Sequence, residues 1–448
     1  MKTQRRMAPG FLASAARGAA CGAFVLLLLS GTLVSADEAV TFREGLHMAV
    51  LRSRPVKAAG YDEAVARDEA VMARAKMLPD VRASISSTHL ANQPAAVFGP
   101  LTAPLSNKDF LSWSVVVQQT LYDFRENASR YEASLKEVET RALDTRRIRN
   151  LAAVEFALTY LDLLEADEAI RVADKEVLRL ESHLRDAQGL YGEGVITRNE
   201  VLQAEVRLSD ARQRRLAAMN ARLVGQAKIN SLLQRPLDSE MKVTDEGVGS
   251  RELPAMSSHE AWGAALRERP EMQIMDLMWQ GLQLRRTAAR AAYYPRFFVR
   301  GAYDYEENRY QLHENNWSLV LGAGISLYSG GSTGAEVSKI DHQLLKLAEQ
   351  KDKLADDIML EVEKYVLNAQ DAKGRTSVTK DAAAQAEENL RINRARYEEG
   401  VGTATDVLDA ISLLTMAETN HNRAVYDSRK AEVAVLYSIG KDLLEVYR

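Results

Sequence analysis

Two stretches of this sequence match each other: YGEGVITRNEVLQA at residues 191–204 and YEEGVGTATDVLDA at residues 397–410. Aligned without a gap, eight of the fourteen positions are identical, and the stretches lie 206 residues apart. Each stretch supplies a glycine where a helix can end, Gly194 or Gly400, and then Thr or Asn where the next helix can begin. We therefore expect a helix–turn–helix that is used twice, in a chain built by tandem duplication.

The same order of elements extends outward from both turns. Leu121-Tyr122 and Leu327-Tyr328 are related by the same 206-residue offset. We expect barrel-type strands at about 80–88 and 111–122, 296–305 and 317–328, and long helix pairs at 125–234 and 333–440. The first of these helices would be ~100 Å long at 1.5 Å per residue. The fold class is mainly α with a small β part, built from a tandem-duplicated helix-helix-strand-strand-long helix-helix unit.

The amino terminus has the pattern of a signal peptide. A basic region is followed by an apolar run and by the small residues before Asp37. Cys21, the only cysteine, follows Arg17 rather than an apolar run, so we do not expect lipidation there. We divide the chain into a signal peptide, a first repeat, a linker and a second repeat: 1–36, 37–236, 237–256 and 257–448.

Composition excludes several classes of function. The net charge is −4 and no basic patch carries interleaved aromatic residues, so nucleic acid is not an expected partner. The seven histidines have no ligand spacing, and no Ser/His/Asp set is suggested. The glycine-rich segment 329–334 lacks the spacing of a phosphate-binding loop. We expect no enzyme, with no catalytic residue, no cofactor and no metal site. After residue 36 no apolar stretch reaches the length of an α-helical membrane span.

Each expected strand has one apolar and one polar or small face, which allows two interpretations. The strands could bury their apolar faces in a small sandwich, giving a structural periplasmic coiled-coil protein without channel activity. Alternatively they cross a membrane, because their lengths are near 9–11 residues and aromatic residues lie near their ends. These expected membrane-interface aromatics are Trp113, Tyr122, Trp317 and Tyr328. Since four strands cannot close a barrel, several protomers would have to share one.

The order of elements, the stretch 397–410 and the segment LYSGG at 327–331 resemble the TolC-like outer membrane efflux family. The resemblance implies a trimeric 12-stranded membrane β-barrel joined to a long periplasmic α-helical barrel. It implies extracellular loops at 89–109 and 306–316, and tips at 191–200 and 397–406 that close the periplasmic mouth. The implied function is an outer-membrane exit duct of a tripartite efflux or type I secretion system. The implied partners are two further copies in a homotrimer, a periplasmic adaptor (membrane fusion) protein, an inner-membrane RND or ABC transporter, and outer-membrane lipid.

The second tip carries two acidic residues, Asp406 and Asp409, which match positions that ring the narrow entrance in this family. Residues three apart lie on one helix face, so threefold symmetry would place a ring of carboxylates around a constriction. Such rings favour cations. A purely structural role, stabilising the start of a helix, would explain Asp406 but not Asp409.

The resemblance also implies a closing network of tyrosine, arginine and acid between neighbouring tips. Tyr397 matches the tyrosine, and Glu200 takes the place of an aspartate. Gly402 stands where the arginine is expected, and Arg198 is the candidate replacement. Gly194 and Gly400 are expected to form the tip turns.

Overall fold

The computed structural model describes residues 40–245 and 256–448. The predicted signal peptide, with Cys21, and part of the predicted linker lie outside the described residues.

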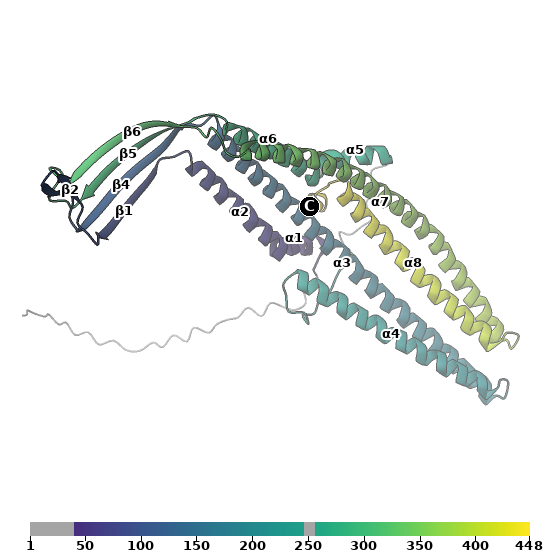
Figure 1. The fold of residues 1–448 in the computed structure, drawn as a ribbon. Helices are drawn as coiled ribbons and strands as arrows, with labels where there is room; N and C mark the ends of the chain where they lie inside the picture. The colour runs from purple at the N-terminus through teal and green to yellow at the C-terminus, as the bar shows by residue number, and fades with distance from the viewer. Residues whose placement is uncertain (1–39, 246–255) are drawn as a thin grey trace, which may run out of the picture. The chain divides into compact units, whose positions relative to one another are not determined.

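The first half has the expected order of elements, with one additional hairpin between its two long strands (Figure 1). Thr41 caps the first helix by accepting a hydrogen bond from the Glu44 backbone N–H, and Pro55 stands in the first turn of the second, where its missing N–H is harmless. The elements are α1 (Phe42–Arg52), α2 (Arg54–Ala75), β1 (Asp80–His89), β2 (Ala95–Phe98), β3 (Leu101–Pro104), β4 (Asp109–Tyr122), α3 (Glu126–Gly192) and α4 (Arg198–Leu232).

The second half repeats the first helix by helix. Its elements are α5 (Ser258–Glu268), α6 (Pro270–Ala291), β5 (Arg296–Glu306), β6 (Asn315–Gly324), α7 (Ser332–Glu398), α8 (Ala404–Ser438) and α9 (Leu443–Val446). The helices α1 and α5 both have 11 residues, α2 and α6 have 22, α3 and α7 have 67, and α4 and α8 have 35. Matching lengths in matching order confirm the tandem repeat and the mainly helical fold class with a small β part.

The four long strands form one antiparallel sheet in the order β1-β4-β5-β6 (Figure 1). One face is apolar and bare: Trp317, Leu319 and Leu321 expose 73%, 64% and 74% of their surface. The sandwich interpretation is wrong for the described part of the chain, because nothing there covers this face. Among the described residues, the edge strands β1 and β6 each have one unpaired side.

Two sequence expectations about the sheet need correction. The expected loop 89–109 contains the hairpin β2–β3, in which Val97 pairs with Thr102. The expected strand 317–328 ends at Gly324, because Gly324 already pairs with Arg296, the first residue of β5, and Pro295 precedes that strand. Tyr328 therefore lies beyond the strand.

The largest hydrophobic core lies around Phe42 of α1 and Tyr160 of α3. The two rings meet edge to face with centroids 5.3 Å apart. The Tyr160 hydroxyl accepts a hydrogen bond from the Thr244 N–H at 3.0 Å and lies 2.9 Å from the Val40 carbonyl oxygen, to which it can donate. This core fixes the start of the first repeat and the end of α4 to the middle of α3. Among the described residues, no helix is both long and apolar enough to cross a membrane.

Candidate functional site

The two tips have the same backbone. Gly194 and Gly400 adopt φ values of 75° and 74°, the left-handed region that glycine reaches without a steric penalty. Just after them, the Val195 N–H donates to the Leu190 carbonyl and the Val401 N–H to the Arg396 carbonyl, which closes each long helix. The structure thus puts both expected tip glycines at the helix ends.

Both acidic residues of the second tip are exposed on α8. Asp406 also forms a capping box with Thr403, the N-cap of α8: the Thr403 N–H donates to Asp406 Oδ2 at 3.0 Å, and the Asp406 N–H donates to Thr403 Oγ1 at 3.2 Å. The bonds from the Thr403 backbone and side chain hold the pKa of Asp406 below its ordinary value. No such cap involves Asp409 in the described residues, so its carboxylate is left to solvent or to another chain.

Tyr397 lies inside the second tip rather than on its surface. It is 3% exposed, in a cluster that includes Leu180 of α3 and Leu408 of α8. Its ring lies 5.2 Å, centroid to centroid, from that of His183 of α3, which is also 3% exposed. Burial lowers the pKa of His183, while Asp186 acts against this shift. Burial raises the pKa of Tyr397, and its hydroxyl has no hydrogen-bond partner among the described residues.

An arginine that the sequence reasoning missed joins the two tips. Arg394 of α7 donates from Nη2 to Ser182 Oγ at 2.8 Å and to Asp186 Oδ2 at 3.2 Å, both on α3. By contrast, Arg198 is exposed without an ion pair in the described residues, and Glu200 accepts a hydrogen bond from the Thr197 N–H at 3.4 Å. Within one chain, Arg394 is therefore the arginine that links α7 to α3 at the tips, and the role of Arg198 stays a prediction. The only sequence signal of Arg394 is that it stands one turn before the tyrosine.

Further ion pairs link α3 to α8 away from the tips. Arg179 of α3 binds Glu418 of α8 through two 2.8 Å contacts, and Lys430 of α8 contacts Asp162 and Glu165 of α3 at 2.5 and 2.6 Å. Burial acts to raise the pKa of Glu418, but the Arg179 guanidinium outweighs it and lowers the pKa. A ladder of charge-assisted contacts therefore joins the first hairpin, α3–α4, to the second, α7–α8.

The expected membrane-interface aromatics fall into two groups. Trp113 of β4 stacks on Tyr303 and Tyr305 of β5 with centroids 5.4 and 5.9 Å apart, and Trp317 pairs in register with Tyr303. These residues lie toward the end of the sheet away from the helices. Tyr122 and Tyr328 lie at the opposite end, where the strands meet the helices.

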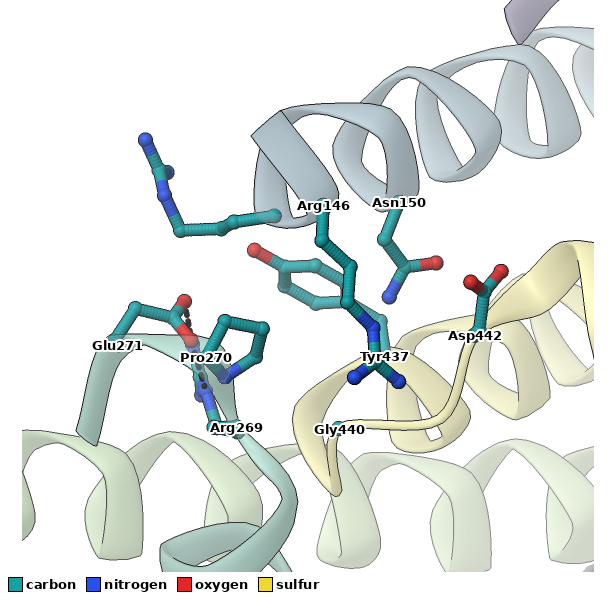
Figure 2. Close-up of a pocket in the computed structure, with 9 residues that line it drawn as sticks. Arg146, Asn150, Arg269, Pro270, Glu271, Tyr437, Gly440 and Asp442 are labelled. Carbon is teal, nitrogen blue, oxygen red and sulfur yellow. Dashed lines mark hydrogen bonds and ion pairs between the residues drawn. The ribbon is translucent and has the colours of Figure 1, made fainter. Parts of the chain in front are cut away.

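A pocket where α3, α6 and the end of α8 meet is a structural joint (Figure 2). Arg269 contacts Glu271 at 3.0 Å and Glu361 at 2.5 Å, and its guanidinium lies 5.6 Å from the centre of the Tyr437 ring. Burial acts to lower the pKa of Arg269, but the two carboxylates raise it above its ordinary value. The charges of Arg269, Glu271 and Glu361 are therefore paired with one another, and we assign this pocket a structural role.

Comparison with known proteins identifies the class of protein. The sequence pattern of the family described as outer membrane efflux protein matches residues 45–234 and 262–441. The alkaline protease secretion protein AprF of Pseudomonas aeruginosa is 23% identical over 421 residues, which are 91% of this chain and 84% of that protein. The outer membrane efflux protein BepC of Brucella suis biovar 1 is 20% identical over 422 residues, 93% of this chain and 89% of that protein.

A solved structure has the same fold. The outer membrane protein VceC of Vibrio cholerae superposes with a TM-score of 0.78 at 17% identity, covering 89% of this chain and 96% of that one. The family pattern covers both repeats, so this chain belongs to the outer membrane efflux protein family. It is a TolC-like protein of the outer membrane with a long periplasmic helical part.

Proposed function

We propose that three copies of this chain form an outer-membrane exit duct of a tripartite efflux or type I secretion system, which passes its cargo without chemical change. The observation that supports this most is the four-stranded sheet with a bare apolar face and two open edges. Open edges are not tolerated in lipid, and four strands cannot close on themselves. Three such sheets joined edge to edge would make a twelve-stranded barrel without free edges.

The division of the chain follows from this proposal. Residues 1–36 direct export, and the repeats 37–236 and 257–448 each supply two strands and one long hairpin, joined by the linker 237–256. In the trimer the hairpins would form the helical wall of the periplasmic part. The loops 89–109 and 306–316 would lie outside the cell.

The tips would form the periplasmic mouth. Asp406 and Asp409 are exposed one turn apart on α8, so three copies would ring the entrance with six carboxylates, two from each chain. Arg198 and Glu200 would act toward a neighbouring tip, since Arg198 has no partner within the described residues of its own chain. Opening would require the hairpins to separate, and the ion pairs between α3 and α8 would resist that separation.

Exposed apolar residues at the tips fit contact with a periplasmic adaptor protein. Val195 and Val401 expose 58% and 69% of their surface at the turns. An adaptor that covers them would couple the duct to an inner-membrane transporter of the RND or ABC type. The relatives are named for both secretion and efflux, so either class of cargo fits the proposal.

Fractionation and electrical recording test this function together. The mature protein should be recovered from outer membranes only with detergent, as a trimer, and should conduct ions across planar bilayers. Recovery from the soluble periplasm without detergent, or purified trimers that never conduct, would contradict the proposal.

A further inference from the structure

The helices that lead into the sheet end in the same way in both repeats. The sequence RAKMLP, residues 74–79, ends α2 before β1, and RAAYYP, residues 290–295, ends α6 before β5. Each contains a cation, then two large apolar or aromatic residues, then proline. We refer to these two segments as the helix–strand corners.

Both corners lie at the same end of the sheet. The strand β4 is antiparallel to both β1 and β5, so β1 and β5 begin at the same end (Figure 1). Gln119 Nε2 of β4 donates to the Met77 carbonyl at 2.7 Å, and Arg296 contacts Glu126 of α3 at 2.6 Å. The first corner is therefore tied to β4, and the residue that follows the second corner is tied to α3.

The apolar residues of the corners face solvent in the single chain. Leu78, Tyr293 and Tyr294 expose 54%, 55% and 54% of their surface, and Met77 is exposed as well. They lie directly beside the strands whose apolar face is bare. The exposed apolar residues of the corners thus come directly before the strands β1 and β5, next to charged residues.

Four exposed cations in or near the corners have no ion pair among the described residues. Arg74, Lys76 and Arg290 belong to the corners, and Arg285 lies further back in α6. Neighbouring cations are paired, such as Arg82 with Asp80 and Arg296 with Glu126. A favourable interaction with the carboxyl end of a helix accounts for Arg74 and Arg290. It does not account for the exposed Met-Leu and Tyr-Tyr pairs that follow them.

A groove extends this cationic surface. Arg285 and Lys339 line it together with Ser332 and Thr333, the first two residues of α7. Glu336 also lines it and pairs with Lys339 at 2.8 Å. Hydroxyls and a free guanidinium in one groove suit a phosphate group.

We propose that the helix–strand corners bind anionic phospholipid headgroups of the periplasmic leaflet of the outer membrane. Met77, Leu78, Tyr293 and Tyr294 occupy the boundary between acyl chains and headgroups, where amphipathic aromatic side chains are favoured. Arg74, Lys76, Arg285 and Arg290 contact the phosphates, because basic residues beside a membrane span attract anionic lipid. This inference rests on the proposed function, since the corners meet lipid only if the bare face of the sheet does.

The lipid that the purified trimer retains measures the binding of anionic headgroups directly. The full mature trimer is placed in nanodiscs that contain equal amounts of phosphatidylglycerol and phosphatidylcholine, and the lipid kept after mild detergent extraction is quantified. The wild-type protein should retain phosphatidylglycerol several-fold over phosphatidylcholine. The variant carrying Arg74→Gln, Lys76→Gln, Arg285→Gln and Arg290→Gln should retain both lipids equally.

A control removes the same charge elsewhere. Arg185, Arg207, Lys373 and Lys380 are exposed on the long helices, so their change to Gln should leave the preference intact. A wild-type protein that inserts into bilayers without preferring phosphatidylglycerol, or a corner variant that keeps the preference, would overturn the inference alone. A wild-type protein that inserts into no bilayer would overturn the proposed duct as well.

Discussion

The guanidinium of Arg179 on α3 donates two hydrogen bonds, each 2.8 Å long, to the carboxylate of Glu418 on α8. Both side chains are mostly covered, with 22% and 17% exposed. The two residues are 239 positions apart, so this contact joins the first hairpin to the second. Hydrogen bonds to charged groups are worth about 1.5–3 kcal/mol.

Removing this contact should favour the open mouth. The change Glu418→Gln leaves Arg179 without its charged partner, so the hairpins separate more easily and the open probability rises in planar bilayers. The exchange variant, Arg179→Glu with Glu418→Arg, should restore the closed state. The matched control is Arg212→Gln, which breaks an ion pair with Glu181 inside the first hairpin and should leave gating unchanged. Equal gating of the Glu418 variant and the wild type would refute this role.

Acidification should loosen the packing between the hairpins through His183. Burial lowers the pKa of His183 while the two hairpins are packed together. As the pH falls, His183 therefore binds a proton more readily when the hairpins are separated than when they are packed. The stabilising effect is therefore present above the ordinary pKa of about 6.5 and is lost as the pH falls below it. The charged or titratable neighbours are Asp186 of α3, Glu200 of α4, and Arg394 and Tyr397 of α7.

Open probability recorded over a falling pH series measures this effect. It should rise below about pH 6.5 in the wild type and stay nearly flat in His183→Gln. His421→Gln is the control, because that histidine lies on α8 beside Thr379, away from this cluster, and should behave as the wild type. Identical pH profiles for His183→Gln and the wild type would show that His183 does not cause the pH dependence.

The buried face of Tyr397, rather than its hydroxyl, should matter for the packing of the second tip within one chain. Its hydroxyl has no partner among the described residues, so Tyr397→Phe should leave melting temperature and gating unchanged or slightly improved. Tyr397→Ala empties a buried site and should destabilise the tip by about 3–5 kcal/mol. If Tyr397→Phe opened the channel, a bond to another chain, as the closing network implies, would be required.

A side chain at the left-handed turn of Gly400 should destabilise the second tip. Gly400→Ala should destabilise the tip by roughly 1–2 kcal/mol, although the added carbon would touch nothing within 4 Å. The matched control is Gly189→Ala inside α3, where the same space is free and φ is helical; there alanine should stabilise by about 0.5–1 kcal/mol. Hydrogen exchange of the backbone amides at the tips distinguishes the two variants. Equal protection of these amides in both variants would argue against backbone strain at Gly400.

Most of the fold follows from local patterns in the sequence. Apolar periodicity, the prolines at 79 and 295 and the tip glycines set the ends of the helices and strands within a few residues. The β2–β3 hairpin was missed because prolines usually interrupt strands, whereas here Pro94 precedes β2 and Pro100 lies in the turn. The early end of β6 depends on where its partner β5 begins, which the alternation of β6 itself cannot reveal.

Only those features of the candidate site that depend on a short stretch of sequence could be predicted. The duplicated motif locates Asp406 and both tip turns. The pairing of Arg394 with Asp186 spans 208 residues, and no spacing rule links such positions. The burial of Tyr397 against His183 depends likewise on how two hairpins pack, so the sequence indicated the tyrosine but not its surroundings.

Block of the channel by a trivalent cation tests the mouth most directly. Purified trimers are recorded in planar bilayers while hexamminecobalt is added from the side of the tips, and the variant with Asp406→Asn and Asp409→Asn is compared with the wild type. A variant with Asp210→Asn and Asp381→Asn loses the same charge elsewhere on the helices and serves as the control. Block should weaken by about tenfold or more only in the first variant, since each lost charge contributes on the order of 1 kcal/mol in water. Unchanged block in that variant would show that the carboxylates of the second tip do not line the entrance.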